Sequence, residues 1–125
     1  MSTYVSTAEG KGRGVFTDKR LHKGETIESA PVIEFPEEEW EHIGETVFGV
    51  YCFFWGENFK DGAMVLGNGS LFNHSYSPNA IYCRRLSDKV MDFIAIRGIE
   101  AGEEITINYN GDPDDKDPVW FDVVG

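Results

Sequence analysis

Three short segments of the 125-residue chain hold the side chains that could do chemistry. Residues 73–79 read Asn-His-Ser-Tyr-Ser-Pro-Asn, a cluster of hydrogen-bond donors and acceptors on an extended or turn-forming path. Residues 102–109 read Gly-Glu-Glu-Ile-Thr-Ile-Asn-Tyr, a glycine turn and a strand ending in tyrosine. Residues 10–16 alternate glycine with other residues, which allows a ligand to approach the backbone. Taken singly, each segment is better explained by an ordinary turn or, for Tyr109, by a core tyrosine.

Two other kinds of site are disfavoured by the same residues. The loop 10–16 is no dinucleotide fingerprint, because no strand precedes it and no helix follows it. The chain has two cysteines, Cys52 and Cys83, and three histidines, without the ligand spacing of a structural zinc site, so no metal is expected. Buried thiols of a cytosolic protein explain the two cysteines better than a disulfide does.

The elements that must position these segments are mostly short strands. Apolar runs separated by glycine predict a mainly β domain, a β-rich α+β class, with strands at 14–17, 26–28, 32–35, 50–55, 63–66, 80–86 and 91–96. The polar turn 87–89 predicts a hairpin between the last two. Only 36–43 is predicted to be helical, because a proline and then acidic residues suit the first turn of a helix.

The C-terminal segment has a different character. Residues 112–118 are polar and predict a solvated linker, which is followed by Val119, Trp120 and Phe121. A polar linker that ends in two aromatic residues indicates a segment that docks back onto the domain. A frayed terminus is the alternative.

The charge of the chain restricts its partners. Eleven basic and 22 acidic residues give a formal net charge of −11, which disfavours direct nucleic-acid binding and favours a basic protein or peptide. A merely soluble, acidic protein explains the charge equally well. No apolar run approaches the roughly 18–20 residues that span a bilayer, and the N-terminus does not resemble a signal peptide, so a cytoplasmic protein without membrane contact is expected.

Taken together and in this order, the three segments resemble the SET-domain family of protein-lysine methyltransferases. The resemblance runs from about Gly10 to Gly111, and residues 63–75 are similar to short stand-alone viral and bacterial members. It implies a single SET domain over 1–125, with a core at about 10–111 and a tail, 112–125, that acts as a lid over cofactor or substrate. The implied fold has several small curved sheets, one short helix and a C-terminal pseudoknot that brings Tyr109 beside Asn73.

The resemblance also implies an activity and a set of site residues. The activity is S-adenosylmethionine-dependent methyl transfer to the side-chain amine of a lysine in a basic protein substrate. Tyr109 would be the catalytic tyrosine, with Tyr51 and Ile107 bordering the lysine channel. The residues expected at the cofactor are Lys11, Gly12, Arg13, Gly14, Asn73, His74, Tyr109, Trp120 and Phe121. Small family members include dimers, so a homodimer is compatible with the resemblance.

This chemistry needs few special side chains. The donor methyl is already activated, so neither a metal nor a nucleophilic side chain is required. The difficulty is the lysine, because about one in 10³ is unprotonated at neutral pH, a penalty of roughly 4–5 kcal/mol. An apolar channel disfavours the ammonium form. We therefore expect Tyr109 to position the amine and not to abstract its proton.

Three positions depart from the usual family pattern. Ser70 stands where many members carry arginine, Tyr76 where many carry cysteine, and Asn108 where aspartate is usual. Two alternatives follow: a module that binds the cofactor or a basic peptide without transferring methyl, and an acidic interaction protein without a ligand. A methyl-transfer assay separates the first alternative from the enzyme, and calorimetry with S-adenosylmethionine separates the second.

Overall fold

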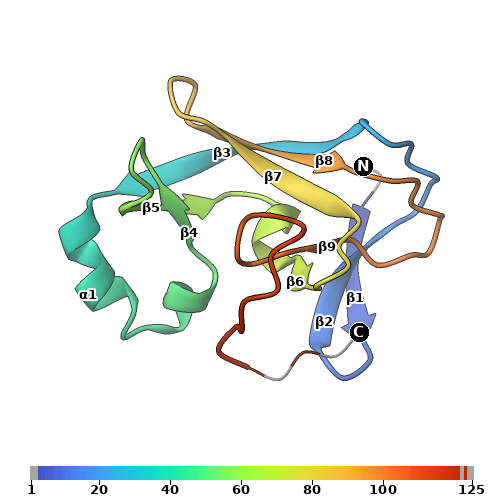
Figure 1. Cartoon of the computed structure of the whole chain (residues 1–125), viewed down its shortest axis with the longest axis horizontal. Helices are drawn as coiled ribbons and strands as arrows, with labels where there is room; N and C mark the ends of the chain where they lie inside the picture. The colour runs from blue at the N-terminus through green and yellow to red at the C-terminus, as the bar shows by residue number, and fades with distance from the viewer. Residues whose placement is uncertain (1–2, 122, 124–125) are drawn as a thin grey trace.

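The chain folds into three sheets joined by short helical turns. The computed structural model describes residues 3–121 and 123 (Figure 1). An N-terminal hairpin pairs β1 (Thr3–Ala8) with β2 (Gly12–Thr17). The central sheet has the order β4-β5-β3-β8-β7, with bounds β3 Thr26–Phe35, β4 Phe53–Trp55, β5 Asp61–Val65, β7 Ala80–Arg85 and β8 Val90–Ala95. The third sheet is the parallel pair of β6 (Asn73–His74) and β9 (Thr106–Ile107). The predicted mainly β class is confirmed.

The long strand β3 joins two strands that the sequence predicts separately. Its first half, Thr26 to Pro31, pairs with β8, and its second half, Val32 to Phe35, pairs with β5. Pro31, which has no backbone N–H to donate, lies where the strand changes partner. The strand therefore continues through the proline and connects the two halves of the central sheet.

The hairpin predicted between 80–86 and 91–96 is confirmed, since β7 and β8 pair from Ala80↔Ala95 to Arg85↔Val90. The predicted strand 50–55 is partly wrong. Val50 ends the helical turn η2 (Val47–Val50), and only Phe53–Trp55 is extended. This turn begins at Thr46, whose side chain accepts a hydrogen bond from the N–H of Phe48.

The helices of the structure are single short turns of three or four residues. The predicted helix 36–43 is a 3-10 turn, η1 (Glu37–Glu39), followed by α1 (Trp40–Ile43). A further turn, η3 (Asn68–Leu71), precedes β6 and packs closely on the central sheet. Gly69 in η3 lies directly on the ring of Phe93, where any added Cβ would overlap the ring atoms. A glycine is therefore required for η3 to approach β8.

The core lies between the central sheet and the segments that build the parallel pair. Its largest fully buried side chains are Trp55, Phe72, Phe93, Leu21, Met91, Ile99, Ile105 and Ile107. Phe72 meets Phe93 edge-on, with ring centroids 5.0 Å apart, a favoured aromatic geometry. Because Phe72 immediately precedes β6, this packing fixes where that strand begins.

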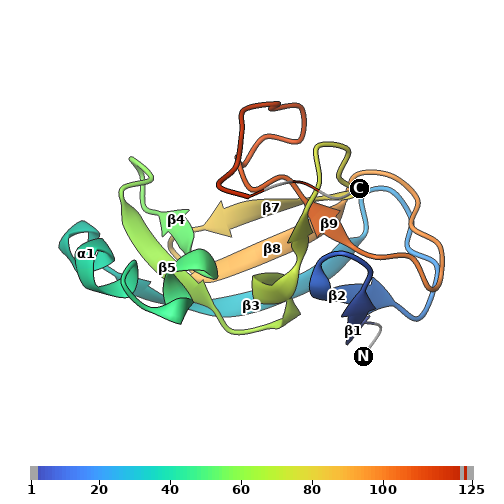
Figure 2. The same cartoon turned by 90° about the horizontal axis from the view of Figure 1, so that it is seen from below.

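The parallel pair brings distant segments together. Asn73 lies opposite Thr106 and His74 opposite Ile107, so β6 and β9 run side by side next to the N-terminal hairpin (Figure 2). The buried side chain of Asn79 holds the incoming strand: its Oδ1 accepts from the N–H of Thr106 at 2.9 Å, and its Nδ2 donates to the carbonyl of Glu104 at 2.8 Å. The predicted convergence of the Asn-His segment and the tyrosine segment is confirmed.

Two expectations about the cysteines have different outcomes. Cys52 and Cys83 are free thiols, as favoured over a disulfide, but both are half-buried and not buried. Cys52 lines a groove, and Cys83 lies on β7 at the edge of the sheet, so neither reaches the core.

Within residues 3–121 and 123, no helix has the length and apolar character needed to cross a membrane.

Candidate active site

The glycine-rich loop between β1 and β2 borders an open space. Gly12 has φ +82°, a conformation that L-residues rarely adopt, and a Cβ added there would meet nothing within 4 Å. Lys11, Gly12 and Arg13 line the groove next to it. The loop therefore exposes backbone to a ligand-sized space, as the glycine spacing predicts.

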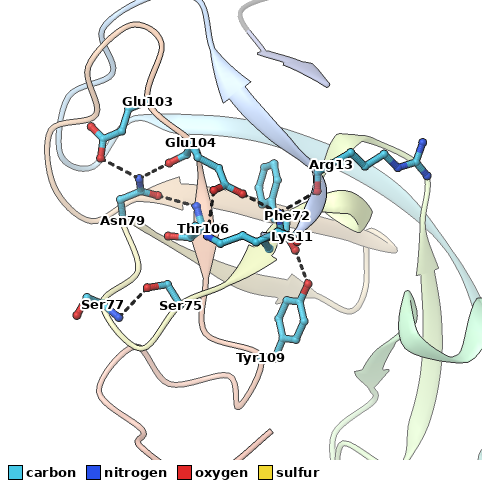
Figure 3. A network of polar contacts seen from close by, with 11 residues as sticks. Lys11, Arg13, Phe72, Ser75, Ser77, Asn79, Glu103, Glu104, Thr106 and Tyr109 are labelled. Atoms are coloured by element: carbon cyan, nitrogen blue, oxygen red, sulfur yellow. Dashed lines mark hydrogen bonds and ion pairs between the residues drawn. The ribbon is translucent and has the colours of Figure 1, made fainter. Parts of the chain in front are cut away.

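The carboxylate of Glu104, two residues before β9, ties this loop to β6. Glu104 accepts from Lys11 Nζ at 3.0 Å and from Asn73 Nδ2 at 2.7 Å (Figure 3). The same Asn73 amide donates to the carbonyl of Arg13 at 2.9 Å. The side chains of Lys11 and Glu104 are only 16% and 17% exposed. We call this arrangement the Glu104 clasp.

Gly14 is required by the Glu104 clasp. A Cβ at this position would overlap Oε2 of Glu104 and lie 2.8 Å from Asn73 Nδ2. Gly14 is buried behind the loop and does not line the groove. Its role is thus to let the hairpin approach the parallel pair.

Tyr109 is fixed at both ends. Its hydroxyl donates to the carbonyl of Phe72 at 2.6 Å (Figure 3). Its backbone N–H donates to Nδ1 of His74 at 2.9 Å. Burial, followed by the neighbouring Tyr51, Glu104 and Tyr82, raises the pKa of Tyr109 to about 12. The phenol therefore stays protonated at neutral pH and acts as a hydrogen-bond donor.

His74 supports Tyr109 from inside the fold and is only 3% exposed. Because Nδ1 accepts from Tyr109, the hydrogen-bond network assigns the neutral imidazole with its proton on Nε2. Burial, and then the charge of Lys11, lowers the pKa of His74. Nε2 has no hydrogen-bond partner among the described residues, and the ring of Tyr76 lies perpendicular to the imidazole at 4.6 Å.

Two grooves meet at Tyr109. The glycine-loop groove encloses about 390 Å³ and is lined by Lys11, Gly12, Arg13, Val50, Tyr51, Ser70, Leu71, Asn73, Tyr109, Trp120 and Phe121. The tyrosine groove encloses about 200 Å³ and is lined by Trp40, Gly49, Val50, Tyr51, Cys52, Phe53, Phe54, Gly69, Ser70, Phe72, Tyr82, Tyr109 and Trp120. Both grooves are lined by Val50, Tyr51, Ser70, Tyr109 and Trp120. Their volumes suit small ligands or single side chains.

The C-terminal aromatic residues dock onto this junction. The indole of Trp120 stacks on the ring of Tyr109, with centroids 5.6 Å apart and planes inclined by 16°. Phe121 lies 6.0 Å from the ring of Tyr109 and 6.1 Å from that of His74. The segment docks back onto the domain, as predicted, although Trp120 remains 64% exposed.

Most of the predicted site residues converge. Those that line the glycine-loop groove are Lys11, Gly12, Arg13, Asn73, Tyr109, Trp120, Phe121 and Tyr51. Gly14 and His74 are buried directly behind it, whereas Ile107 is fully buried in the hydrophobic core and lines neither groove. Residues such as Val50, Ser70 and Phe72 were not predicted, because they come from helical turns and their ends, which have no regular apolar alternation.

Comparison with known proteins decides the family. The family model for the SET domain matches residues 12–110, which include the glycine loop, the parallel pair and Tyr109. The chain belongs to the SET-domain family. This SET domain is 34% identical over 119 residues to a Schizosaccharomyces pombe histone-lysine N-methyltransferase specific for H3 lysine 37; the alignment covers 94% of this chain and 76% of that protein.

Solved structures have the same fold. A proposed histone methyltransferase of Plasmodium falciparum superimposes on this SET domain with a TM-score of 0.67 at 29% identity, over 86% of this chain and 92% of that chain. The structure of Polycomb Repressive Complex 2 from Chaetomium thermophilum, autoinhibited and bound to S-adenosylmethionine, superimposes with a TM-score of 0.70 at 20% identity. The match covers 86% of this chain and 15% of that chain. The predicted SET fold is confirmed.

Proposed function

We propose that Tyr109 is the catalytic tyrosine of this SET-domain enzyme and that it separates a cofactor groove from a lysine channel. The enzyme transfers a methyl group from S-adenosylmethionine to the side-chain amine of a lysine in a protein substrate. The observation that carries the proposal is that Tyr109 lines both grooves while its hydroxyl is fixed on the carbonyl of Phe72.

The glycine-loop groove has the features that S-adenosylmethionine needs, and it is the proposed cofactor site. That cofactor supplies a methyl group already activated on a positively charged sulfur. Lys11, Gly12 and Arg13 offer backbone beside open space, and Trp120 and Phe121 offer aromatic faces. Asn73 lines the groove, and its side-chain amide, engaged in the Glu104 clasp, fixes the wall of the groove beside the loop. Gly14 and His74 act from behind, by seating the loop and holding the N–H of Tyr109.

The tyrosine groove is the proposed lysine channel. Its walls are mainly aromatic, with Tyr51, Phe53, Phe72 and Tyr82 around the entry to Tyr109. An apolar wall disfavours the ammonium form and therefore lowers the pKa of a lysine placed there. The phenol of Tyr109 is protonated and cannot serve as a general base near neutral pH, so its contribution is to position the amine. Ile107 has no role in this proposal, because it belongs to the core.

A basic substrate is the proposed partner. The acidic residues of η1 and α1 are exposed and have no ion pair within the described part of the chain: Glu37, Glu38, Glu39 and Glu41. They lie around Trp40, which lines the tyrosine groove. The yeast relative acts on H3 lysine 37 according to its name, and a basic, lysine-bearing segment of that kind would complement this surface. Cytoplasmic location, the absence of nucleic-acid binding and a homodimer stay predictions.

The substitution Tyr109→Phe tests the proposal. Removing the hydroxyl leaves the ring and its stack with Trp120 in place but loses the hydrogen bond to Phe72. We expect kcat to fall by about 10²-fold or more, while the Kd for S-adenosylmethionine, measured by calorimetry, changes little. Tyr4→Phe, on the exposed side of β1, is the matched control. Undiminished kcat in Tyr109→Phe would remove Tyr109 from the catalytic role.

A further inference from the structure

The segment after β9, drawn in dark red in Figure 1, brings Trp120 into the lining of both grooves. We call residues 112–121 the strap. Resting on the proposed function, in which Trp120 offers an aromatic face to the cofactor, we infer that Tyr76, Asn108 and Asn110 are positioning residues. They latch the strap to the domain and thereby set how tightly the cofactor is held.

The latch consists of side-chain donors that reach strap carbonyls. Tyr76 Oη and Asn110 Nδ2 both donate to the carbonyl of Asp117, at 2.9 and 2.8 Å. Asn108 Nδ2, on a residue that is only 2% exposed, donates to the carbonyl of Asp115 at 2.7 Å. The strap is therefore held from two places: the turn after β6 and the chain just beyond β9.

One contact runs in the opposite direction. Lys116 Nζ donates to the carbonyl of Tyr76 at 2.7 Å, and its ammonium lies 5.9 Å from the centre of the Tyr76 ring. Tyr76 thus donates to the strap through its hydroxyl and accepts from the strap through its backbone. The strap is thus anchored at Asp117, three residues before Trp120. The chain from Asp117 to Trp120 can span about 10 Å at most, so the anchor restricts where the indole can lie.

The latch, and not the burial of Trp120, holds the strap in place. Trp120 is 64% exposed, so its stack on Tyr109 excludes little water. The same indole lines both grooves. When the latch is weakened, Trp120 leaves the junction more often and the cofactor groove opens. We therefore expect weaker cofactor retention with little change in the rate of transfer from the filled site.

Tyr76→Phe and Asn110→Ala each remove one donor to the carbonyl of Asp117 and leave both grooves' lining intact. We expect KM and Kd for S-adenosylmethionine to rise about three- to tenfold in each, the effect of one hydrogen bond, with kcat within about twofold of wild type. In a Trp120→Ala background, Tyr76→Phe should have a smaller effect on Kd, because the latch acts mainly through the indole, with Phe121 as the other strap side chain in the cofactor groove. Tyr4→Phe is again the control.

A second measurement needs no cofactor. Trypsin cleavage after Lys116, followed by mass spectrometry, reports how often the strap is released, and Tyr76→Phe should accelerate it several-fold. Cleavage after Lys89, in the β7–β8 turn, is the internal control and should not change. If wild-type protein neither binds S-adenosylmethionine nor methylates lysine, the proposed function fails, and the cleavage rate still decides whether the latch exists. The inference would be overturned if Tyr76→Phe left the rate of cleavage at Lys116 unchanged, or if neither variant changed KM for S-adenosylmethionine. It would also be overturned if Tyr76→Phe raised Kd as much in the Trp120→Ala background as in wild type.

Discussion

At the scale of single residues, the site depends on protonation states that burial fixes. The raised pKa of Tyr109 keeps its phenol protonated even in alkaline solution, and the lowered pKa of His74 favours its neutral imidazole. The two are joined by the hydrogen bond from the N–H of Tyr109 to Nδ1 of His74. A doubly protonated imidazole could not accept this bond, so acid should disturb the tyrosine through the histidine.

The pH dependence of stability should report His74. Its pKa in the folded protein lies below the unfolded value of about 6.5, so the stabilisation is complete above pH 6.5 and is lost as the pH falls below it. We expect the melting temperature of wild-type protein to drop between pH 6.5 and 5, and His74→Asn, which keeps an acceptor but does not titrate, to drop less. NMR titration of the imidazole checks the assignment directly. A midpoint for His74 at or above 6.5 would contradict it.

At the scale of elements, three segments become one site through the parallel pair β6–β9 and the Glu104 clasp. The carboxylate of Glu104 forms an ion pair with Lys11 of the loop and accepts a hydrogen bond from the side chain of Asn73 in β6. Among the residues that the structure describes, one other side-chain hydrogen bond joins the loop to the parallel pair, from the Asn73 amide to the carbonyl of Arg13. The position of the glycine loop should therefore depend on this carboxylate.

Glu104→Gln tests the clasp. It keeps the size of the side chain but removes the charge, and we expect the free energy of unfolding to fall by about 1–2 kcal/mol, as for a charged hydrogen bond in a partly buried site. KM for S-adenosylmethionine should rise with it. The matched control is Glu100→Gln, whose partner Arg20 and own side chain are both exposed, where about 0.5 kcal/mol or less is expected. Equal losses in the two variants, measured by urea denaturation, would argue against the clasp.

The sequence predicts the elements unevenly, for physical reasons. Alternation identifies β7 and β8, because one face is buried, and composition identifies the helical start at Pro36. The strand predicted between the glycine turn at 102 and Tyr109 is observed as the shorter β9. Neither property identifies β6, a two-residue strand that is defined by its pairing with β9 more than thirty residues further along the chain. The motif order locates Asn73 and Tyr109, but the burial of Ile107 and the latch through Tyr76 depend on tertiary packing that no local pattern encodes.

At the scale of the whole molecule, charge governs the encounter with substrate. The net charge of −11 and the unpaired carboxylates of η1 and α1 create a negative potential near the tyrosine groove. Such a field accelerates and strengthens binding of a basic peptide at low salt and is screened as ionic strength rises.

Ionic strength should therefore separate the two ligands. Between 50 and 500 mM salt, where the Debye length falls from roughly 14 to 4 Å, we expect KM for a basic lysine peptide to increase several-fold. The KM for S-adenosylmethionine should change much less. Glu38→Gln combined with Glu39→Gln should flatten the peptide's salt dependence. A peptide KM that is independent of salt would show that these carboxylates do not take part.

The parallel pairing of β6 with β9 also has a consequence in time. The pairing of residues 73–74 with residues 106–107 closes a loop of chain that contains the β7–β8 hairpin. Contacts so far apart along the chain are slow to form, because the entropy of closing the loop is lost before any bond rewards it. The central sheet has the same requirement, because β3 and β8 pair residues 59–68 positions apart. The sheet and the catalytic centre should therefore assemble late and together, and a partly refolded molecule should gain its sheet and its activity in the same step.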